Sequence, residues 1–293
     1  MAADFETFEA QLREANEEIN RRSGRPLLAA VLTGLVLGGL VMTGIFFKPV
    51  MVIVAVAATV AGSSELANAL RGTGRRVPRI PVIVVAIAGP PAGYWLGSAG
   101  LWAATLAGIA FVALWRIVEQ VAPARRVGAA LLVRDVLAST LVILYVTFLC
   151  SWSMVLHAQP LGEWWLLGCL IVVIANDIGA YAVGLTLGRH PMAPTISPKK
   201  SWEGFAGGIA ASLVAGVLVA TLMWQQPWWV GIIAGLLFLG SGTMGDLAES
   251  LVKRDIGIKD MSGWMPGHGG VLDRLDSIAP SLVIAFGLYA LLA

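Results

Sequence analysis

Apolar stretches of about 20 residues recur along almost the whole chain, separated by short polar segments. An α-helix needs about 20 apolar residues to cross a hydrocarbon core roughly 30 Å thick. The pattern therefore predicts an all-α integral membrane protein with about nine transmembrane helices. The predicted spans are residues 27–47, 49–70, 79–95, 98–118, 133–156, 163–187, 204–224, 228–252 and 277–293.

The basic residues of the loops test this division into spans. Short cytoplasmic loops of membrane proteins hold the excess of Lys and Arg. With a cytoplasmic N-terminus, all of the 20 Lys and Arg residues except Lys48 fall on the cytoplasmic side. A span missed or invented in the middle of the chain would move every later loop to the other side. We therefore expect a multi-pass protein of the cell (inner) membrane with its N-terminus in the cytoplasm.

The first residues differ from the rest of the chain. Apolar side chains recur there at alternating spacings of three and four, as on one stripe of a helix. They are Phe5, Phe8, Leu12, Ala15 and Ile19. This spacing predicts an amphipathic helix within residues 1–26. Two interpretations remain open, namely a helix lying on the inner membrane surface and a helix packing against a second subunit.

Composition supports the membrane class and excludes others. The chain is 57% hydrophobic and 13% charged, whereas roughly a quarter of the residues of a soluble domain are charged. A net charge of +2 is too small to indicate nucleic-acid binding, so we expect no nucleic-acid partner. Cys150 and Cys169 lie in apolar surroundings without a C-x-x-C pattern, which predicts packing residues and no disulfide or zinc site.

Carboxylates gather near the inner ends of two predicted spans. Asp177 lies near the inner end of the sixth span, and Asp246 and Glu249 lie near that of the eighth. Ionisable groups at such depth are costly unless they face water, a partner or a metal. On a helix, Asp246, Glu249, Ser250 and Lys253 recur at three and four residues and so share one face. This face predicts a functional site.

The segment that follows adds cations, glycines and further acids. Its polar residues are Arg254, Lys259, Asp260, His268, Asp273, Arg274 and Asp276, with Gly267, Gly269 and Gly270 around the histidine. Carboxylates hold Mg²⁺, cations neutralise phosphate charge, and glycine backbone approaches phosphate closely, so the pattern suits phosphoryl or nucleotidyl transfer. Ordinary charge beside the membrane would explain Lys253 and Arg254. It would not explain five carboxylates on the cytoplasmic side of the membrane, which favours cations. His268, considered by itself, is better interpreted as a turn residue than as a general base.

A second polar segment is expected on the same inner side. Asn176-Asp177 and Tyr181 precede it, and Ser197-Pro198-Lys199-Lys200-Ser201 places two cations and two hydroxyls in an extended stretch. The two segments could meet over one substrate. Lys199 and Lys200 could instead bind anionic lipid headgroups.

One motif is misleading. Residues 240–245 satisfy G-x-G-x-x-G but lie inside an apolar span with no strand before them, so a dinucleotide site is excluded on context. We expect these glycines to permit close helix packing or local unwinding beside Asp246. The sequence also contains no P-loop motif.

The C-terminal segment resembles the signature of phosphatidate cytidylyltransferases (CDP-diacylglycerol synthases). The matching residues are Ser250, Lys253-Arg254, Lys259-Asp260, Pro266-Gly-His-Gly-Gly270, Asp273-Arg274 and Asp276. Met265 stands where that family more often has Leu, Ile or Phe, which conserves volume. Together with the segments around Asp177 and Lys200, the resemblance extends over roughly the last 130 residues.

The resemblance implies a multi-pass homodimer that uses CTP, phosphatidic acid and Mg²⁺, with a second cation left open, to make CDP-diacylglycerol and pyrophosphate. It implies metal binding by Asp246 and Asp273, with Glu249, Asp276 and Asp177 as further candidates. It implies phosphate contacts from Lys253, Arg254, Lys259, Arg274, Lys199 and Lys200, with Ser197, Ser201, Gly269 and Gly270 as further substrate-binding positions and His268 for substrate positioning. The expected organisation is a cytoplasmic helix in 1–26, N-terminal transmembrane helices in 27–160 and a C-terminal catalytic region in 161–293, with a cytoplasmic active site.

Two other functions remain open. A CTP-dependent lipid-alcohol kinase would cleave CTP at the γ-phosphorus and release CDP. A transporter for an anionic metabolite could also collect intramembrane acids and inner-side cations, but it would move substrate without consuming CTP.

Overall fold

The computed structural model describes residues 27–263 and 269–293, with side chains from residue 32 onward. The expected amphipathic helix within residues 1–26 and the expected positioning residue His268 lie outside the described residues. The helices are α2 (Leu27–Phe46), α3 (Lys48–Gly72), α4 (Arg79–Glu119), α5 (Ala129–Val142), α6 (Leu149–His157), α7 (Gly162–Leu187), α8 (Trp202–Leu222), α9 (Trp228–Ile256), α10 (Leu272–Leu275) and α11 (Ile278–Leu292). Two short helices of other types are η1 (Pro123–Arg125) and η2 (Ile143–Phe148), and the strands are β1 (Pro191–Ala193) and β2 (Ser197–Ser201).

Long apolar helices dominate the described part of the chain, which confirms an all-α membrane protein. Seven of its helices are long and apolar enough to cross a membrane. They are Lys48–Gly72, Arg79–Glu119, Ala129–His157, Gly162–Leu187, Trp202–Leu222, Trp228–Ile256 and Leu272–Leu292. The expected count of nine stays a prediction.

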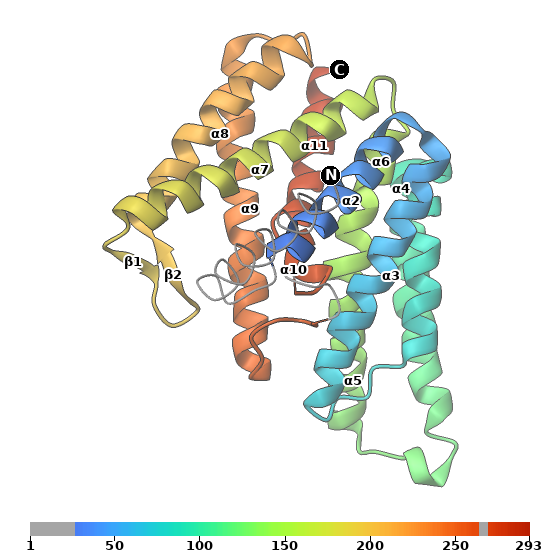
Figure 1. Ribbon diagram of the computed structural model, residues 1–293. Coiled ribbons are helices and arrows are strands. Elements are labelled where there is room, and N and C mark those ends of the chain that lie inside the picture. The colour runs from blue at the N-terminus through green and yellow to red at the C-terminus, as the bar shows by residue number, and fades with distance from the viewer. Residues whose placement is uncertain (1–26, 264–268) are drawn as a thin grey trace, which may run out of the picture.

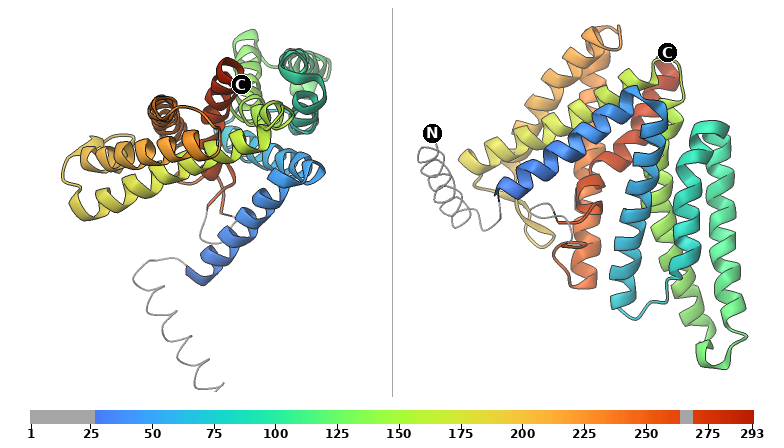
Figure 2. Two further views of the ribbon diagram at one scale, coloured as in Figure 1. Left: turned by 90° about the horizontal axis from the view of Figure 1, so that it is seen from above. Right: turned by 45° about the vertical axis from the view of Figure 1, so that its right-hand side comes forward.

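Helix α4 accounts for part of the difference between seven and nine. Its 41 residues would extend about 60 Å if straight, twice the thickness of a hydrocarbon core. Gly97 interrupts it with a φ of 67° and a ψ of −159°, a conformation that favours glycine. Gly108 in the second half lies against Val85 in the first, so the two halves fold back and pack side by side (Figure 2).

The helices form two groups joined by the C-terminal helix. Figure 1 shows α7, α8 and α9 on one side and α3 to α6 on the other. Helix α11 lies between the groups and contacts α6, α7 and α9. The expected boundary at residues 160 and 161 falls in the turn between α6 and α7, and the division into two regions stays a prediction because α11 packs on both groups.

Three elements bring polar residues to one end of the molecule. Strands β1 and β2 form an antiparallel hairpin in which Pro191 pairs with Ser201 and Ala193 with Ser197. The hairpin connects α7 to α8, and the last turns of α9 lie beside it (Figure 1). The expected extended conformation of residues 197–201 is therefore confirmed.

Candidate active site

The last turns of α9 present one polar face, as the spacing predicts. Ser250 Oγ donates to Asp246 Oδ1 at 3.3 Å, and Lys253 Nζ lies 3.4 Å from Glu249 Oε1. The helix ends where Gly257 adopts a φ of 79°, in the left-handed conformation typical of a helix C-terminus. Helix α9 thus carries the acid pair and the cation to the end of a membrane-spanning segment.

The hairpin meets this face of α9. Lys200 Nζ of β2 lies 2.5 Å from Asp246 Oδ2, and Arg254 Nε donates to the carbonyl oxygen of Ile196 at 3.2 Å. A cavity of about 370 Å³ opens beside the Lys200–Asp246 contact. Its polar lining comes from α7, the hairpin and α9 and comprises Asn176, Asp177, Tyr181, Lys199, Lys200, Ser201, Thr243 and Asp246. The structure therefore brings together the two segments that the sequence places on the same side.

Acids from three separate segments meet beside this cavity. Asp177 of α7, Asp246 of α9 and Asp276, just after α10, lie close enough to interact electrostatically. Ser277 bridges two of them, since its backbone N–H donates to Asp276 Oδ1 at 2.7 Å and its hydroxyl to Asp177 Oδ2 at 3.5 Å. Glu249 is fully buried, and neither of its carboxylate oxygens forms a hydrogen bond within the described residues. We call Asp177, Lys200, Asp246, Glu249, Lys253, Asp273 and Asp276 the acid–lysine cluster.

A glycine of the misleading motif permits this convergence. A side chain at Gly245 would place its Cβ 2.0 Å from the carbonyl oxygen of Asp276. Only glycine therefore lets α9 approach the backbone that carries Asp276 so closely. The expected close helix packing beside Asp246 is confirmed.

Asp273 has a different environment from Asp246. Its Oδ1 accepts from Lys253 Nζ at 2.8 Å, while its Oδ2 accepts from the backbone N–H groups of Gly270 at 2.8 Å and Met261 at 3.1 Å. Its side chain is 8% exposed, against 35% for that of Asp246. In this arrangement Asp273 ties the loop after α9 to the end of α9, and Asp246 faces the cavity.

The remaining expected substrate-binding residues have three kinds of position. Ser201 caps α8, because its Oγ accepts from Gly204 N at 3.1 Å. Lys259 and Arg274 are exposed at the same end of the molecule. Gly269, with a φ of 77°, and Gly270 form the described end of the glycine-rich loop.

The donor set fits one particular way of holding Mg²⁺. Within residues 27–263 and 269–293, no three His, Cys, Asp or Glu residues are arranged to hold a metal ion directly. The acids nevertheless supply hard oxygen donors beside a cavity, and the buried Glu249 oxygens lack hydrogen bonds there. Mg²⁺ usually keeps several waters and binds one or two carboxylates together with substrate phosphates. The residues fit that mode and not an all-protein cage.

Sequence reasoning missed Glu65 of α3, which the structure places in this region. Glu65 is 6% exposed. Its Oε1 accepts from Ser262 Oγ at 2.6 Å and from Val271 N at 3.0 Å, and its Oε2 accepts from Leu272 N at 2.9 Å. An acid from the N-terminal half thus anchors both ends of the glycine-rich loop. A signal existed, because Glu65 is the single acid in the predicted span 49–70.

Comparisons with known proteins identify the family of this chain. The family model described as the Cytidylyltransferase family matches residues 28–292. The chain is 39% identical over 281 residues to a protein named phosphatidate cytidylyltransferase from Mycobacterium bovis, covering 92% of this chain and 90% of that relative. Proteins of the same name are 35% identical over 284 residues in Mycobacterium leprae, covering 92% and 90%, and 42% identical over 139 residues in Brucella suis, covering 47% and 52%. This chain belongs to the cytidylyltransferase family.

Proposed function

We propose that this chain transfers CMP from CTP to phosphatidic acid and releases pyrophosphate. The observation that carries the proposal is the cavity in which Lys200 meets Asp246, between α7, the hairpin and α9. Acids and lysines from separate elements converge there, as a reaction between two phosphorylated substrates requires. Membership of the family and the names of the full-length relatives support the same reaction.

The chemistry needs little proton transfer. An oxygen of the phosphatidate phosphate attacks the α-phosphorus of CTP, the new P–O bond forms, and the bond to the β-phosphate oxygen breaks to release pyrophosphate. The attacking oxygen is already largely ionised near neutral pH, so positioning and charge neutralisation dominate catalysis. Lys199 and Lys200 would contact the triphosphate from the hairpin, and Lys253 and Arg254 from α9.

The cation site would lie between these groups. Asp246 is its first ligand in this proposal because it faces the cavity, with Asp177, Asp273, Glu249 and Asp276 nearby. Mg²⁺ bound there would neutralise triphosphate charge that the lysines leave uncompensated. A second cation and the positioning role of His268 belong to the same proposal.

Topology and assembly complete the proposal. Nine spans with a cytoplasmic N-terminus are supported by the break at Gly97 and by the one-sided distribution of basic residues, which would put the site on the cytoplasmic face of the cell membrane. We propose a homodimer on the family resemblance. Light scattering of the detergent complex tests the dimer, and labelling of cysteines introduced into single loops tests the topology.

Product analysis tests the reaction. The purified chain receives CTP labelled on the cytosine, phosphatidic acid and Mg²⁺, with and without a chelator. We expect chelator-sensitive CDP-diacylglycerol with one pyrophosphate per lipid product. Release of CDP with a phosphorylated lipid would identify the kinase instead, and flux into sealed vesicles without CTP consumption would identify a transporter.

A further inference from the structure

A second, larger cavity lies at the connections between α3, α4 and α5. Its volume is about 780 Å³, and it shares no lining residue with the cavity beside Asp246. Five arginines and one acid supply its charged lining: Arg71, Arg76, Arg79, Arg116, Arg125 and Glu119. We call it the arginine cavity. Neither the family match nor the proposed reaction assigns it a role.

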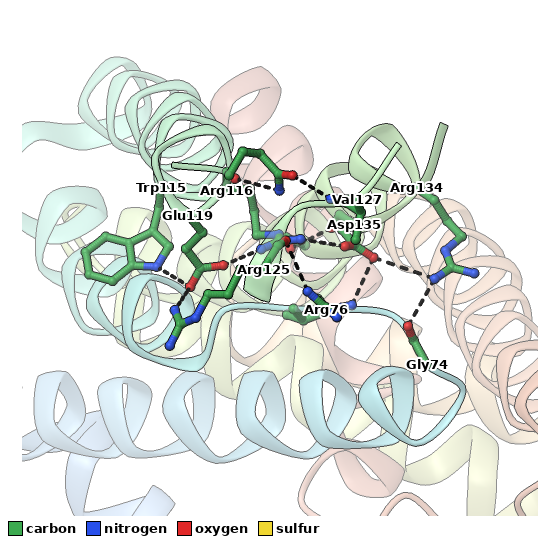
Figure 3. A network of polar contacts seen from close by, with 12 residues as sticks. Gly74, Arg76, Trp115, Arg116, Glu119, Arg125, Val127, Arg134 and Asp135 are labelled. Atoms are coloured by element: carbon green, nitrogen blue, oxygen red, sulfur yellow. Dashed lines mark hydrogen bonds and ion pairs between the residues drawn. The ribbon is translucent and has the colours of Figure 1, made fainter. Parts of the chain in front are cut away.

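A buried ion pair forms the floor of the arginine cavity. Arg116 is 1% exposed, and its Nη2 lies 2.7 Å from Asp135 Oδ2 while its Nη1 contacts Glu119 (Figure 3). The Nε of Arg116 has no hydrogen-bond acceptor among the described residues. Asp135 also accepts from the backbone N–H of Arg76 at 2.9 Å, which fixes the α3–α4 connection to α5. The floor is therefore rigid, and a buried arginine N–H is left without an acceptor.

The rim arginines Arg71, Arg76 and Arg79 form no ion pair with a carboxylate of the described residues. Arg71 donates to the carbonyl oxygen of Val77 at 2.8 Å, and Arg76 donates to that of Arg125 at 3.2 Å. Arg79 donates to the side-chain carbonyl oxygen of Asn68 at 2.9 Å. These neutral acceptors orient the guanidinium groups without neutralising them. Arg125 pairs with Glu119, whose carboxylate Arg116 also contacts. Five arginines thus share two carboxylates, those of Glu119 and Asp135.

The walls of the arginine cavity are apolar. Val77, Pro78, Ile80, Pro81 and Trp115 line it beside the arginines. Ile80 is 67% exposed and Trp115 is 37% exposed, and both lie on α4, one of the helices long and apolar enough to cross a membrane. Tryptophan is enriched where helices meet the membrane surface, with one side in lipid and one side in water.

We propose that the arginine cavity binds the phosphate group of an anionic membrane glycerophospholipid. Arginine forks recognise phosphate oxygens in a bidentate manner, and basic pockets between transmembrane helices are suited to anionic headgroups. The apolar wall distinguishes a lipid from free phosphate, because the glycerol and the upper acyl chain would lie along Ile80 and Trp115. The excess of arginine over carboxylate needs no metal to hold such a ligand.

Native mass spectrometry of the full chain in detergent tests this site. The protein is titrated with phosphatidylglycerol, which is not a substrate of the proposed reaction, and with phosphatidylcholine of the same acyl chains. The double variant Arg76→Gln/Arg79→Gln removes two rim charges and leaves Arg116 and Asp135 in place. Arg75→Gln/Arg126→Gln removes two arginines from the same connections that neither line the cavity nor contact Arg116 or Asp135, and so is the matched control.

We expect wild type and control to retain phosphatidylglycerol over phosphatidylcholine. We expect the rim variant to bind it roughly tenfold more weakly or worse, because each basic residue near anionic lipid contributes about 1 kcal/mol. If the double variant is not monodisperse, Arg79→Gln alone should weaken binding roughly fivefold. Equal retention in wild type and rim variant, equal loss in the control, or equal binding of phosphatidylcholine would overturn the proposal. Displacement of the lipid by millimolar inorganic phosphate would replace the lipid site with a site for a soluble anion.

Discussion

The acid–lysine cluster and the arginine cavity lie on the same side of the predicted topology, but their charges are balanced in opposite ways. In the cluster, five carboxylates meet two lysines, and each lysine already contacts an acid: Lys200 with Asp246, and Lys253 with Asp273 and Glu249. In the cavity, five arginines share two carboxylates. A triphosphate entering the cluster would therefore need added positive charge, which the proposed divalent cation would supply, whereas a phosphate entering the cavity would meet that charge in place.

The difference between lysine and arginine side chains also distinguishes the two regions. Lysine is a compact charge on a flexible stem and can change partner when substrate arrives, while arginine is a planar fork that holds one geometry. The lysines suit a reaction in which charge moves from the α-phosphorus to pyrophosphate. The arginines, fixed by carbonyl oxygens and by the Arg116–Asp135 pair, suit a ligand that stays. We therefore propose a catalytic role for the acid–lysine cluster and static ligand binding for the arginine cavity.

The largest expected effect comes from Asp246. Asp246→Asn keeps the size of the side chain but removes the charge that faces the cavity and Lys200. We expect CMP transfer to fall by about a thousandfold, because a lost metal contact at the reacting phosphates removes several kcal/mol of charge stabilisation. Initial rates with labelled CTP measure this loss, and binding of phosphatidylglycerol should not change.

Asp255→Asn is the matched control for Asp246→Asn. Asp255 is on the same helix, but its side chain is 72% exposed and does not line either cavity. We expect activity within about twofold of wild type, as for most surface substitutions. A folded Asp246→Asn protein with near-normal CMP transfer would show that the acids of the cluster do not hold the reactive phosphates.

Glu65→Gln should have the next largest effect. The amide has one carbonyl oxygen, whereas the two carboxylate oxygens of Glu65 accept from three donors among the described residues alone, and hydrogen bonds to a charged group are worth about 1.5 to 3 kcal/mol each. We expect the loop to open more often and CMP transfer to fall roughly tenfold to a hundredfold. Faster hydrogen exchange at the Val271 and Leu272 amides should accompany the loss.

Glu163→Gln, in the first turn of α7, is the control for Glu65→Gln. This substitution removes the same charge without touching the glycine-rich loop. It should leave hydrogen exchange at Val271 and Leu272 and the rate of CMP transfer unchanged. Normal exchange at Val271 with reduced activity would mean that Glu65 acts on substrate directly, and normal values of both would remove it from the site.

Periodicity and charge left open whether α9 meets the 197–201 segment, but they were enough to predict the helical membrane fold and the polar face of α9. These features are local, since a helix places Asp246 and Lys253 on one face wherever it packs. The contact of Glu65 with Val271 joins residues that are far apart in the chain, and no local pattern encodes it. The division of labour between Asp246 and Asp273 also depends on packing, because both read as equivalent acids until the backbone of Gly270 is placed against one of them.

A smaller effect, on stability and not on catalysis, is expected in the arginine cavity. Asp135→Asn leaves the buried Arg116 with Glu119 as its remaining carboxylate, so the loss should be at most the roughly 3 to 5 kcal/mol that breaking a buried ion pair costs. The midpoint of thermal unfolding in detergent should fall, while CMP transfer measured below that midpoint stays near normal. Replacing both partners with apolar residues, Arg116→Met and Asp135→Leu together, should restore part of the loss because no unpaired charge remains. An Asp135→Asn protein that is fully stable but inactive would contradict the separation of the two regions.

The smallest expected effect concerns the direct link between the two regions. Arg75, in the connection beside the arginine cavity, lies 3.8 Å from Asp255 at the end of α9, and their side chains are 27% and 72% exposed. Exposed ion pairs contribute about 0 to 1 kcal/mol, so Arg75→Gln should change stability by less than that and CMP transfer by less than about twofold. A double-mutant cycle with Asp255→Asn isolates the pair from other effects of each substitution. If the cycle instead gave a strong coupling in CMP transfer that depended on added phosphatidylglycerol, the cavity would control the cluster through this contact. The static site would then be a regulatory one, because a ligand that shifts activity must interact differently with two states of the protein.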